Sequence, residues 1–182
     1  MALDRAVIVS AALNLLDDTG IEGLSMRKLG EVLGVQAPAL YWHFPGKPAL
    51  LEEMAEALLA GVSGRIVGNG DYAHTLRSGA LEMRRALLSR RDGARVFAGT
   101  FVARPNVLSM GEVVIGSLRD AGFAAQTSAR AVFSLMYFVM GFVIEEQALI
   151  EQGREAGGTH PLAEALAAFC SSVTVPCRLA RY

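Results

Sequence analysis

The sequence is poor in cysteine, in net charge and in motifs that carry catalysis, and each shortage excludes a class of protein. Cys170 and Cys177 are the two cysteines, and their spacing without a neighbouring histidine fits no common zinc site, so we interpret them as free thiols. A net charge of −1 argues against nonspecific coating of nucleic acid, so any DNA contact must be local. Without a phosphate-binding loop, a nucleophile elbow or a cluster of metal ligands, we expect neither an enzyme nor a bound metal or cofactor.

Apolar runs are also too short for a membrane protein. The most apolar stretch, residues 131–144, is bounded by charged residues and falls short of the roughly 20 apolar residues of a spanning helix. Residues 1–10 lack the basic-then-apolar order of a signal peptide. We therefore expect a cytoplasmic protein with no membrane partner. Its 52% hydrophobic content must then serve a large core, a subunit interface or an apolar ligand pocket.

Apolar residues recur at helical spacing along most of the chain, which predicts an all-α fold. Asp4, Ser25 and Asp71 stand at the predicted helix starts, where their side chains favour capping. The longest predicted helix has no polar face in its middle and must be buried or packed on a partner. The expected helices cover residues 4–18, 26–33, 37–43, 47–62, 72–88, 94–98, 105–121, 127–151 and a last one from 161 to 169.

The first three predicted helices have the pattern of a helix-turn-helix unit. Gly34 ends the second helix, Val35 follows as the apolar plug of the turn, and Pro38 is tolerated in the first turn of a very short third helix. A generic three-helix bundle is the alternative. We divide the chain into a DNA-binding domain, residues 1–46, and a helical ligand-binding and dimerisation domain, residues 47–182.

Aromatic and polar side chains gather on the short third helix. Small residues on either side of Pro38 keep its N-terminal end narrow, which suits entry into a major groove about 12 Å wide. Tyr41, Trp42 and His43 carry donors for which DNA phosphates are acceptors. For Trp42, packing as a local core residue is an equally good interpretation.

Two cations flank this segment. Arg27 lies at the start of the second helix, where it could reach a guanine or a phosphate, or remain a solvated charge. Lys47 begins the fourth helix, whose free N–H groups and dipole suit a DNA phosphate.

Three motifs carry a resemblance to a known family: LYWH at residues 40–43, LLSRRDGA at 87–94 and GFVIEEQ at 141–147. They resemble the TetR family of repressors, in the branch of the tetracycline repressors, and the similarity extends from about residue 4 to residue 152. It implies a homodimer whose two heads read a palindromic operator in successive major grooves, and a small-molecule inducer that relieves repression. By this resemblance the DNA-facing residues are Arg27, Gln36, Ala37, Pro38, Ala39, Tyr41, Trp42, His43 and Lys47.

The resemblance also places the inducer between the long helices of the body, where this chain departs from the magnesium–tetracycline site. Phe97 stands where the metal-coordinating histidine would be, and Ser63 replaces another polar contact. Gly79 and Met83 occupy the places of an amide and an aromatic ring. Without that histidine we expect no bound magnesium, because octahedral ligation needs its donors held in place.

Thr100 and Glu145 look retained from that site. We expect a mainly apolar and aromatic inducer, since such walls with few polar groups are typical of drug-sized sites. The same side chains could equally be ordinary core, because methionines fill irregular gaps without any ligand. The predicted ligand-binding set is Ser63, Gly79, Met83, Phe97, Thr100, Phe101, Leu118, Val132, Met136, Tyr137 and Glu145.

Residues 47–62 join the head to the body, so we expect this helix to transmit ligand binding to the DNA-reading heads. The tail, residues 171–182, is broken by Pro176 and does not resemble the apolar helix that usually completes the dimer interface with residues 127–151. Dimerisation and operator affinity are therefore open at this point. The alternative function is a helical ligand-binding protein with impaired dimerisation and weak or lost DNA binding.

Overall fold

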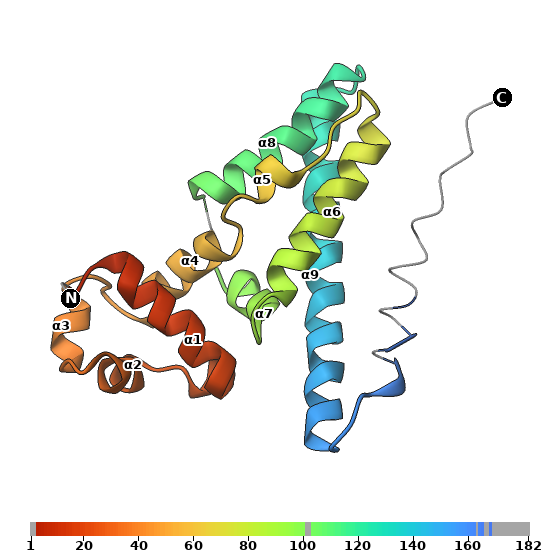
Figure 1. Ribbon diagram of the computed structural model, residues 1–182. Coiled ribbons are helices and arrows are strands. Elements are labelled where there is room, and N and C mark those ends of the chain that lie inside the picture. The colour runs from red at the N-terminus through yellow and green to blue at the C-terminus, as the bar shows by residue number, and fades with distance from the viewer. Residues whose placement is uncertain (1–2, 101–102, 163, 166–167, 169–182) are drawn as a thin grey trace.

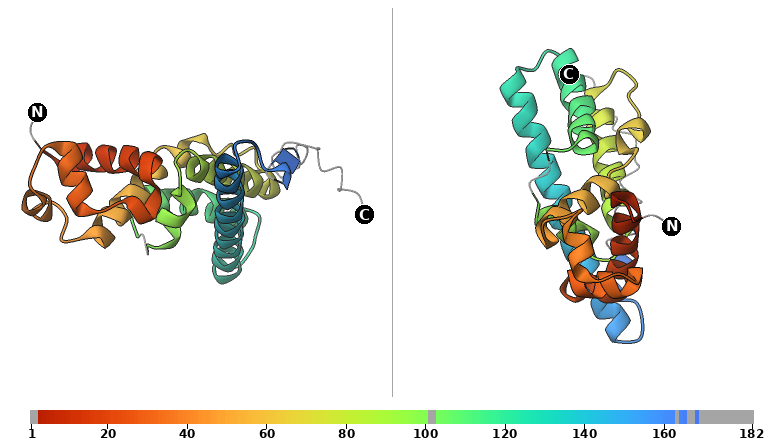
Figure 2. Two further views of the ribbon diagram at one scale, coloured as in Figure 1. Left: turned by 90° about the horizontal axis from the view of Figure 1, so that it is seen from below. Right: turned by 90° about the vertical axis from the view of Figure 1, so that its left-hand side faces the viewer.

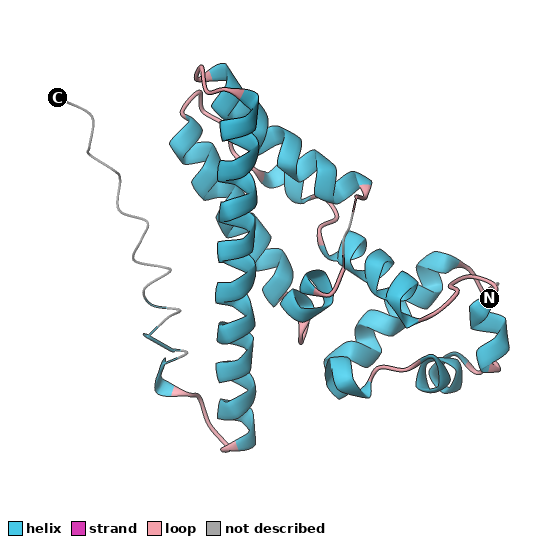
Figure 3. Cartoon of the chain, turned by 180° about the vertical axis from the view of Figure 1, so that it is seen from behind, coloured by secondary structure: helices cyan, strands magenta, loops and turns pink. Residues whose placement is uncertain are grey.

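Helices are the only regular elements of the computed structural model, which describes residues 3–100, 103–162, 164, 165 and 168 (Figures 1 and 3). Within these residues there is no strand, so the all-α prediction is confirmed. In chain order the helices are α1 (Arg5–Gly23), α2 (Met26–Leu33), α3 (Ala37–Tyr41), α4 (Lys47–Leu58), α5 (Val62–Arg65), α6 (Tyr72–Leu88), α7 (Gly93–Ala98), α8 (Pro105–Asp120) and α9 (Ala125–Glu155).

The helix starts expected from capping residues are confirmed. The carboxylate of Asp4 accepts a hydrogen bond from the backbone N–H of Val7 at 2.8 Å. The hydroxyl of Ser25 accepts one from the N–H of Lys28 at 3.2 Å. Each contact satisfies one of the free N–H groups in a first helical turn. α2 consequently has the bounds that the sequence predicted.

Glycines with positive φ break two of the helices. Gly20, expected to stop the first helix, has a φ of 68° and breaks α1, which continues beyond it as a short segment to Gly23. Gly61 has a φ of 70° and separates α4 from α5, where one helix over residues 47–62 was expected. That expectation is wrong because a glycine in the left-handed region stops helical hydrogen bonding. α3 also ends two residues earlier than predicted, at Tyr41.

The head consists of α1 to α3 and packs on α4 (Figure 1). Ile8 and Leu16 of α1, Leu29 of α2 and Leu40 of α3 are fully buried and form its centre. Met54 of α4 is also fully buried and continues this core toward the body. α4 contacts α1 on one side and α7 and α8 on the other, so it is the physical link between head and body.

The body packs α6, α8 and α9 against one another, with α7 wedged between α4 and α9 (Figures 1 and 2). Gly79 allows α6 and α8 to approach closely, because a Cβ there would lie 2.9 Å from a methyl carbon of Val114. Glu146 of α9 is buried and pairs with Arg84 of α6, whose Nε lies 2.9 Å from it. A buried carboxylate needs such a partner to offset its desolvation.

α9 is longer than its predicted range of 127–151 and is buried on one side only in the isolated subunit. Phe133, Tyr137 and Phe138 are between 54% and 69% exposed. By length and composition alone α9 could cross a membrane. The exposed aromatic side chains equally suit a helix that packs on another protein chain.

Some predicted features lie outside the described residues. These are Phe101, both cysteines, the tail from residue 171 onward and most of the last predicted helix.

Candidate functional site

The turn between α2 and α3 depends on two glycines. Gly34 adopts a left-handed conformation with φ 67°, as expected for the residue that ends α2. The N–H of Val35 then donates to the carbonyl of Gly30 at 2.9 Å. A Cβ on Gly30 would lie 2.8 Å from the carbonyl oxygen of Val35, so only glycine fits there. The sequence analysis did not single out Gly30, although a glycine inside an amphipathic helix is a signal of close approach.

The outer face of this turn carries most of the predicted DNA-facing side chains in the open. The side chain of Arg27 is 82% exposed, and its nearest partner is Glu31 at 3.8 Å across one helical turn. Tyr41 is 50% exposed and Trp42 is 90% exposed, so the core alternative for Trp42 is wrong. Gln36 and Pro38 are also exposed, while Ala37 and Ala39 are half-buried against the head.

His43 lies in the turn that follows α3, and its backbone is held by Arg5, a residue that was not among the predicted site residues. The guanidinium of Arg5 donates to the backbone carbonyl of His43, lies 4.3 Å from the ring centre of Phe44, and pairs with Glu53 at 2.7 Å. Arg5 therefore joins the start of α1 to the α3–α4 turn and to α4. The side chain of His43 is half-buried, and the contact with Arg5 fixes the backbone that carries it.

Lys47 is directed differently from the prediction. Its ammonium group donates to the backbone carbonyl of Ile21 at 2.9 Å and is partly buried. This carbonyl belongs to the short segment of α1 that follows the break at Gly20. In this conformation the Lys47 side chain connects α4 to α1.

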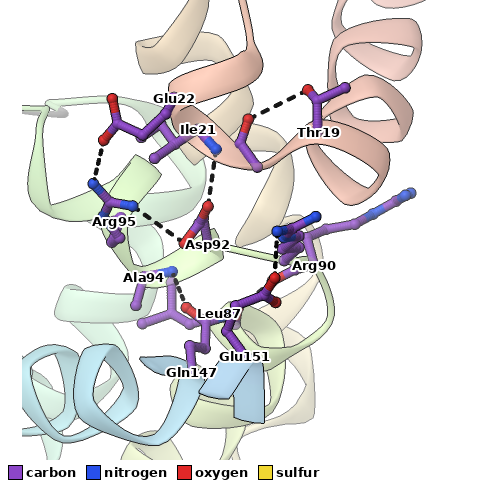
Figure 4. A network of polar contacts seen from close by, with 12 residues as sticks. Thr19, Ile21, Glu22, Leu87, Arg90, Asp92, Ala94, Arg95, Gln147 and Glu151 are labelled. Atoms are coloured by element: carbon purple, nitrogen blue, oxygen red, sulfur yellow. Dashed lines mark hydrogen bonds and ion pairs between the residues drawn. The ribbon is translucent and has the colours of Figure 1, made fainter. Parts of the chain in front are cut away.

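The end of α1 is tied to the corner between α6 and α7 (Figure 4). The Asp92 carboxylate accepts a hydrogen bond from the N–H of Ile21 at 2.8 Å and lies 3.5 Å from Arg95. Arg95 also pairs with Glu22 at 2.6 Å, and this hydrogen bond raises the pKa of Arg95 even though partial burial opposes it. We call the contacts of Asp92 and Arg95 with Ile21 and Glu22 the head–body latch.

The same corner is held from the other side by α9. The side-chain amide of Gln147 donates to the carbonyls of Leu87 and Arg90, at 3.2 and 2.8 Å. Arg91 pairs with Glu151 one turn further along α9. A continuous set of contacts therefore connects the head, through the α6–α7 corner, to the helix that lines the cavity described next.

A cavity of about 300 Å³ opens between α7, α8 and α9. Among its walls are the predicted ligand-binding residues Phe97, Thr100, Val132, Met136 and Tyr137. Side chains of α8 and of the outer face of α9 were not predicted, because they converge on the cavity only through tertiary packing. Those missed lining residues include Val107, Leu108, Met110, Glu112, Ile115, Phe133 and Met140.

The other predicted ligand residues lie elsewhere. Gly79 and Met83 line a neighbouring apolar cavity of about 20 Å³, which shares Val132 and Met136 with the larger one. Ser63 lies on α5, Leu118 is buried in the α8 packing and Glu145 is exposed on α9, and none of the three lines the larger cavity. Phe101 lies outside the described residues. Within the described chain, no three His, Cys, Asp or Glu side chains gather as they would around a metal ion.

An exposed helix-turn-helix face, joined through a polar latch to a helical body with an apolar cavity, defines a ligand-responsive DNA-binding regulator. Comparison with known proteins identifies its kind. The family described as "Bacterial regulatory proteins, tetR family" matches residues 8–54, and "Tetracyclin repressor-like, C-terminal domain" matches residues 67–175.

Individual relatives agree with these matches. The class C tetracycline repressor of Escherichia coli is 43% identical over 157 residues, which are 85% of this chain and 71% of that protein. The crystal structure of a possible TetR family regulator from Streptomyces coelicolor A3(2) has a TM-score of 0.78 and 40% identity, covering 94% of this chain and 89% of that one. TetR(class A) in complex with 5a,6-anhydrotetracycline and magnesium has a TM-score of 0.71 and 37% identity, covering 94% and 97%.

The chain belongs to the TetR family. It is accordingly a transcriptional repressor, with an N-terminal helix-turn-helix for operator DNA and a C-terminal body that binds a small molecule. Proteins of this family are homodimers.

Proposed function

We propose that the chain represses a promoter by inserting α3 of two heads into successive major grooves of a palindromic operator. The observation that carries this proposal is the exposure of Arg27, Gln36, Tyr41 and Trp42 on one helix-turn-helix unit, whose backbone is fixed by Gly30 and Arg5. Side chains placed on a rigid turn read base edges and phosphates without first being ordered. The head, residues 1–46, is the reader in this account, and residues 47–182 are the sensor.

The inducer is a mainly apolar molecule held in the cavity between α7, α8 and α9, and it binds without magnesium. Phe97 supports an apolar inducer bound without magnesium, because this residue is 5% exposed and lies among methionine, aromatic and aliphatic side chains of the cavity wall. A ring at that position offers no metal ligand and excludes the waters that a hydrated magnesium retains. The relative with anhydrotetracycline and magnesium therefore differs from this chain in ligand chemistry.

The conformational change on ligand binding is transmitted to the heads through α4 and the head–body latch. α4 contacts α1, α7 and α8, so a shift of α7 or α8 around the inducer changes the angle at which the head is held. To shift the ratio of released to DNA-binding conformations from 1:99 to 99:1, the inducer must bind the released conformation more tightly by about 5.5 kcal/mol. The protein acts in the cytoplasm, where its operator is, and has no catalytic role.

Titration of purified protein against its own promoter fragment tests the DNA-reading face. Arg27→Ala and Tyr41→Ala should each weaken binding by about tenfold, since a base or phosphate contact contributes about 1–3 kcal/mol. Arg119→Ala removes an exposed arginine of α8 and is the matched control, expected to bind within twofold of wild type.

Loss of salt-sensitive promoter binding only in the head variants supports the proposal. If wild type itself binds this promoter no better than scrambled DNA, the chain is instead a helical ligand-binding protein without operator recognition.

A further inference from the structure

The walls of the cavity between α7, α8 and α9 are rich in groups that attract positive charge. Phe97, Phe133 and Tyr137 supply three aromatic rings, and Met110 and Met136 supply polarisable sulfur. The faces of aromatic rings carry negative partial charge and bind organic cations. Methionine adapts its shape to bulky apolar groups. An apolar cation therefore finds favourable electrostatics on several sides of this space.

The ionisable groups of the cavity lining also favour a positively charged ligand. Glu112 of α8 is the one ionisable acid or base among the described lining residues other than the phenol of Tyr137. Lysine, arginine and histidine are missing from this described lining. An anionic ligand would meet one carboxylate and no compensating cation, whereas a cationic ligand would meet a carboxylate and aromatic faces.

Glu112 also lacks a partner within the described residues. Its carboxylate forms no hydrogen bond or ion pair with any of them and is exposed. Two carboxylates of α4 that meet the start of α8 are already engaged: Glu56 accepts the backbone N–H of Asn106 at 2.9 Å, and Glu53 pairs with Arg104 at 2.9 Å. The charge of Glu112 is therefore free to be satisfied by a ligand.

We propose that the inducer is a lipophilic cation, whose apolar body fills the cavity and whose positive charge lies against Glu112 and the aromatic rings. This inference rests on the proposed function, because it assumes that this cavity holds the inducer. It narrows the ligand class from apolar molecules in general to those with one delocalised or shielded positive charge.

Three probes of similar size and different charge test the proposal by calorimetric titration: tetraphenylphosphonium, triphenylphosphine oxide and tetraphenylborate. The phosphonium cation should bind wild type at least about tenfold more tightly than the borate, and more tightly than the neutral oxide. Glu112→Gln should lower the affinity for the cation about fivefold, since a partly exposed ion pair is screened by solvent. Glu112→Lys should reverse the preference toward the borate.

Asp120→Asn is the matched control, because it removes a carboxylate from the same helix at a position outside this cavity. It should bind the cation within twofold of wild type. If the neutral oxide binds and the cation binds no better, the charge preference is wrong while the apolar cavity of the proposed function stands. If no probe binds, both are wrong, and promoter binding measured on the same sample still reports whether the head functions.

Discussion

Glu82 is a nearly buried carboxylate whose charge is stabilised by two arginines. Its carboxylate is nearly buried on α6, accepts a hydrogen bond from Nε of Arg65 at 2.9 Å and pairs with Arg85. Burial alone would raise the pKa of Glu82, but the hydrogen bonds from Arg65 and Arg85 outweigh it and hold the pKa below its usual value of 4.5. Glu82 thereby fixes α5 to α6 next to the break at Gly61.

This lowered pKa predicts a pH dependence of stability. Because the folded-state pKa lies below the unfolded one, the stabilisation is complete above about pH 4.5 and is lost as the pH falls through the folded value. Glu82→Gln should lower the free energy of unfolding by about 1 kcal/mol at pH 7, a modest amount because both arginines are largely in water.

Urea titrations of wild type and Glu82→Gln at pH 7 and pH 3 measure this effect. The difference between the two proteins should be smaller at pH 3 than at pH 7, because Glu82 is more protonated at the lower pH. Glu145→Gln, an exposed carboxylate of α9, should be neutral at both values. An equal loss for Glu82→Gln at both pH values would show that packing, and not charge, accounts for it.

At the scale of elements, the head–body latch couples α1 to α7. Asp92 adopts a left-handed conformation with φ 55°, which asparagine also tolerates. Asp92→Asn keeps this geometry but removes the charge that faces Ile21 N–H and Arg95, and should cost about 1–2 kcal/mol of stability.

The same variant should weaken the effect that ligand binding has on DNA binding. We expect Asp92→Asn to bind promoter DNA near wild-type affinity at low salt, while the inducing probe releases it less completely. Asp18→Asn, at an exposed carboxylate of α1 with no side-chain hydrogen bond or ion pair to the described residues, is the control for thermal melting and for release. Release as complete as in wild type would show that α4 alone transmits the signal.

Elements of this fold could be predicted where a local signal sets them. The cap Asp4 gave the start of α1, and the cap Ser25 with the stop at Gly34 gave the bounds of α2, since capping acts within a few residues. The break at Gly61 was missed because nothing local distinguished it from a small residue at a helix contact. Most of the predicted DNA-facing residues are exposed, and this too has a local cause. The short helix α3 cannot bury large side chains such as those of Tyr41 and Trp42.

Contacts between distant segments could not be predicted from one sequence. The pairing of Lys47 with the Ile21 carbonyl and the stacking of Arg5 on Phe44 join residues far apart in the chain. The cavity lining has the same origin, because Glu112 and Phe133 meet there only when α8 packs on α9. Helical periodicity reports which face is apolar, not which face of which helix it will meet.

At the scale of the whole molecule, two subunits are needed for operator recognition. One head presents few contacts, and the family's homodimer doubles them. Phe138 of α9, which is 69% exposed and does not line the cavity, marks a face of this subunit suited to bury a partner. In the mechanism that we propose, such a dimer sets the spacing of the two heads, and the inducer changes that spacing.

Hydroxyl-radical footprinting of the purified protein on its own promoter tests this account most directly. It predicts two protected patches on one face of the duplex, related by an inverted repeat and separated by about 34–36 Å, one helical turn. Adding a cavity ligand should remove both patches together. Protection that is uniform along the fragment, or absent at protein concentrations where the chain is folded and dimeric, would contradict it.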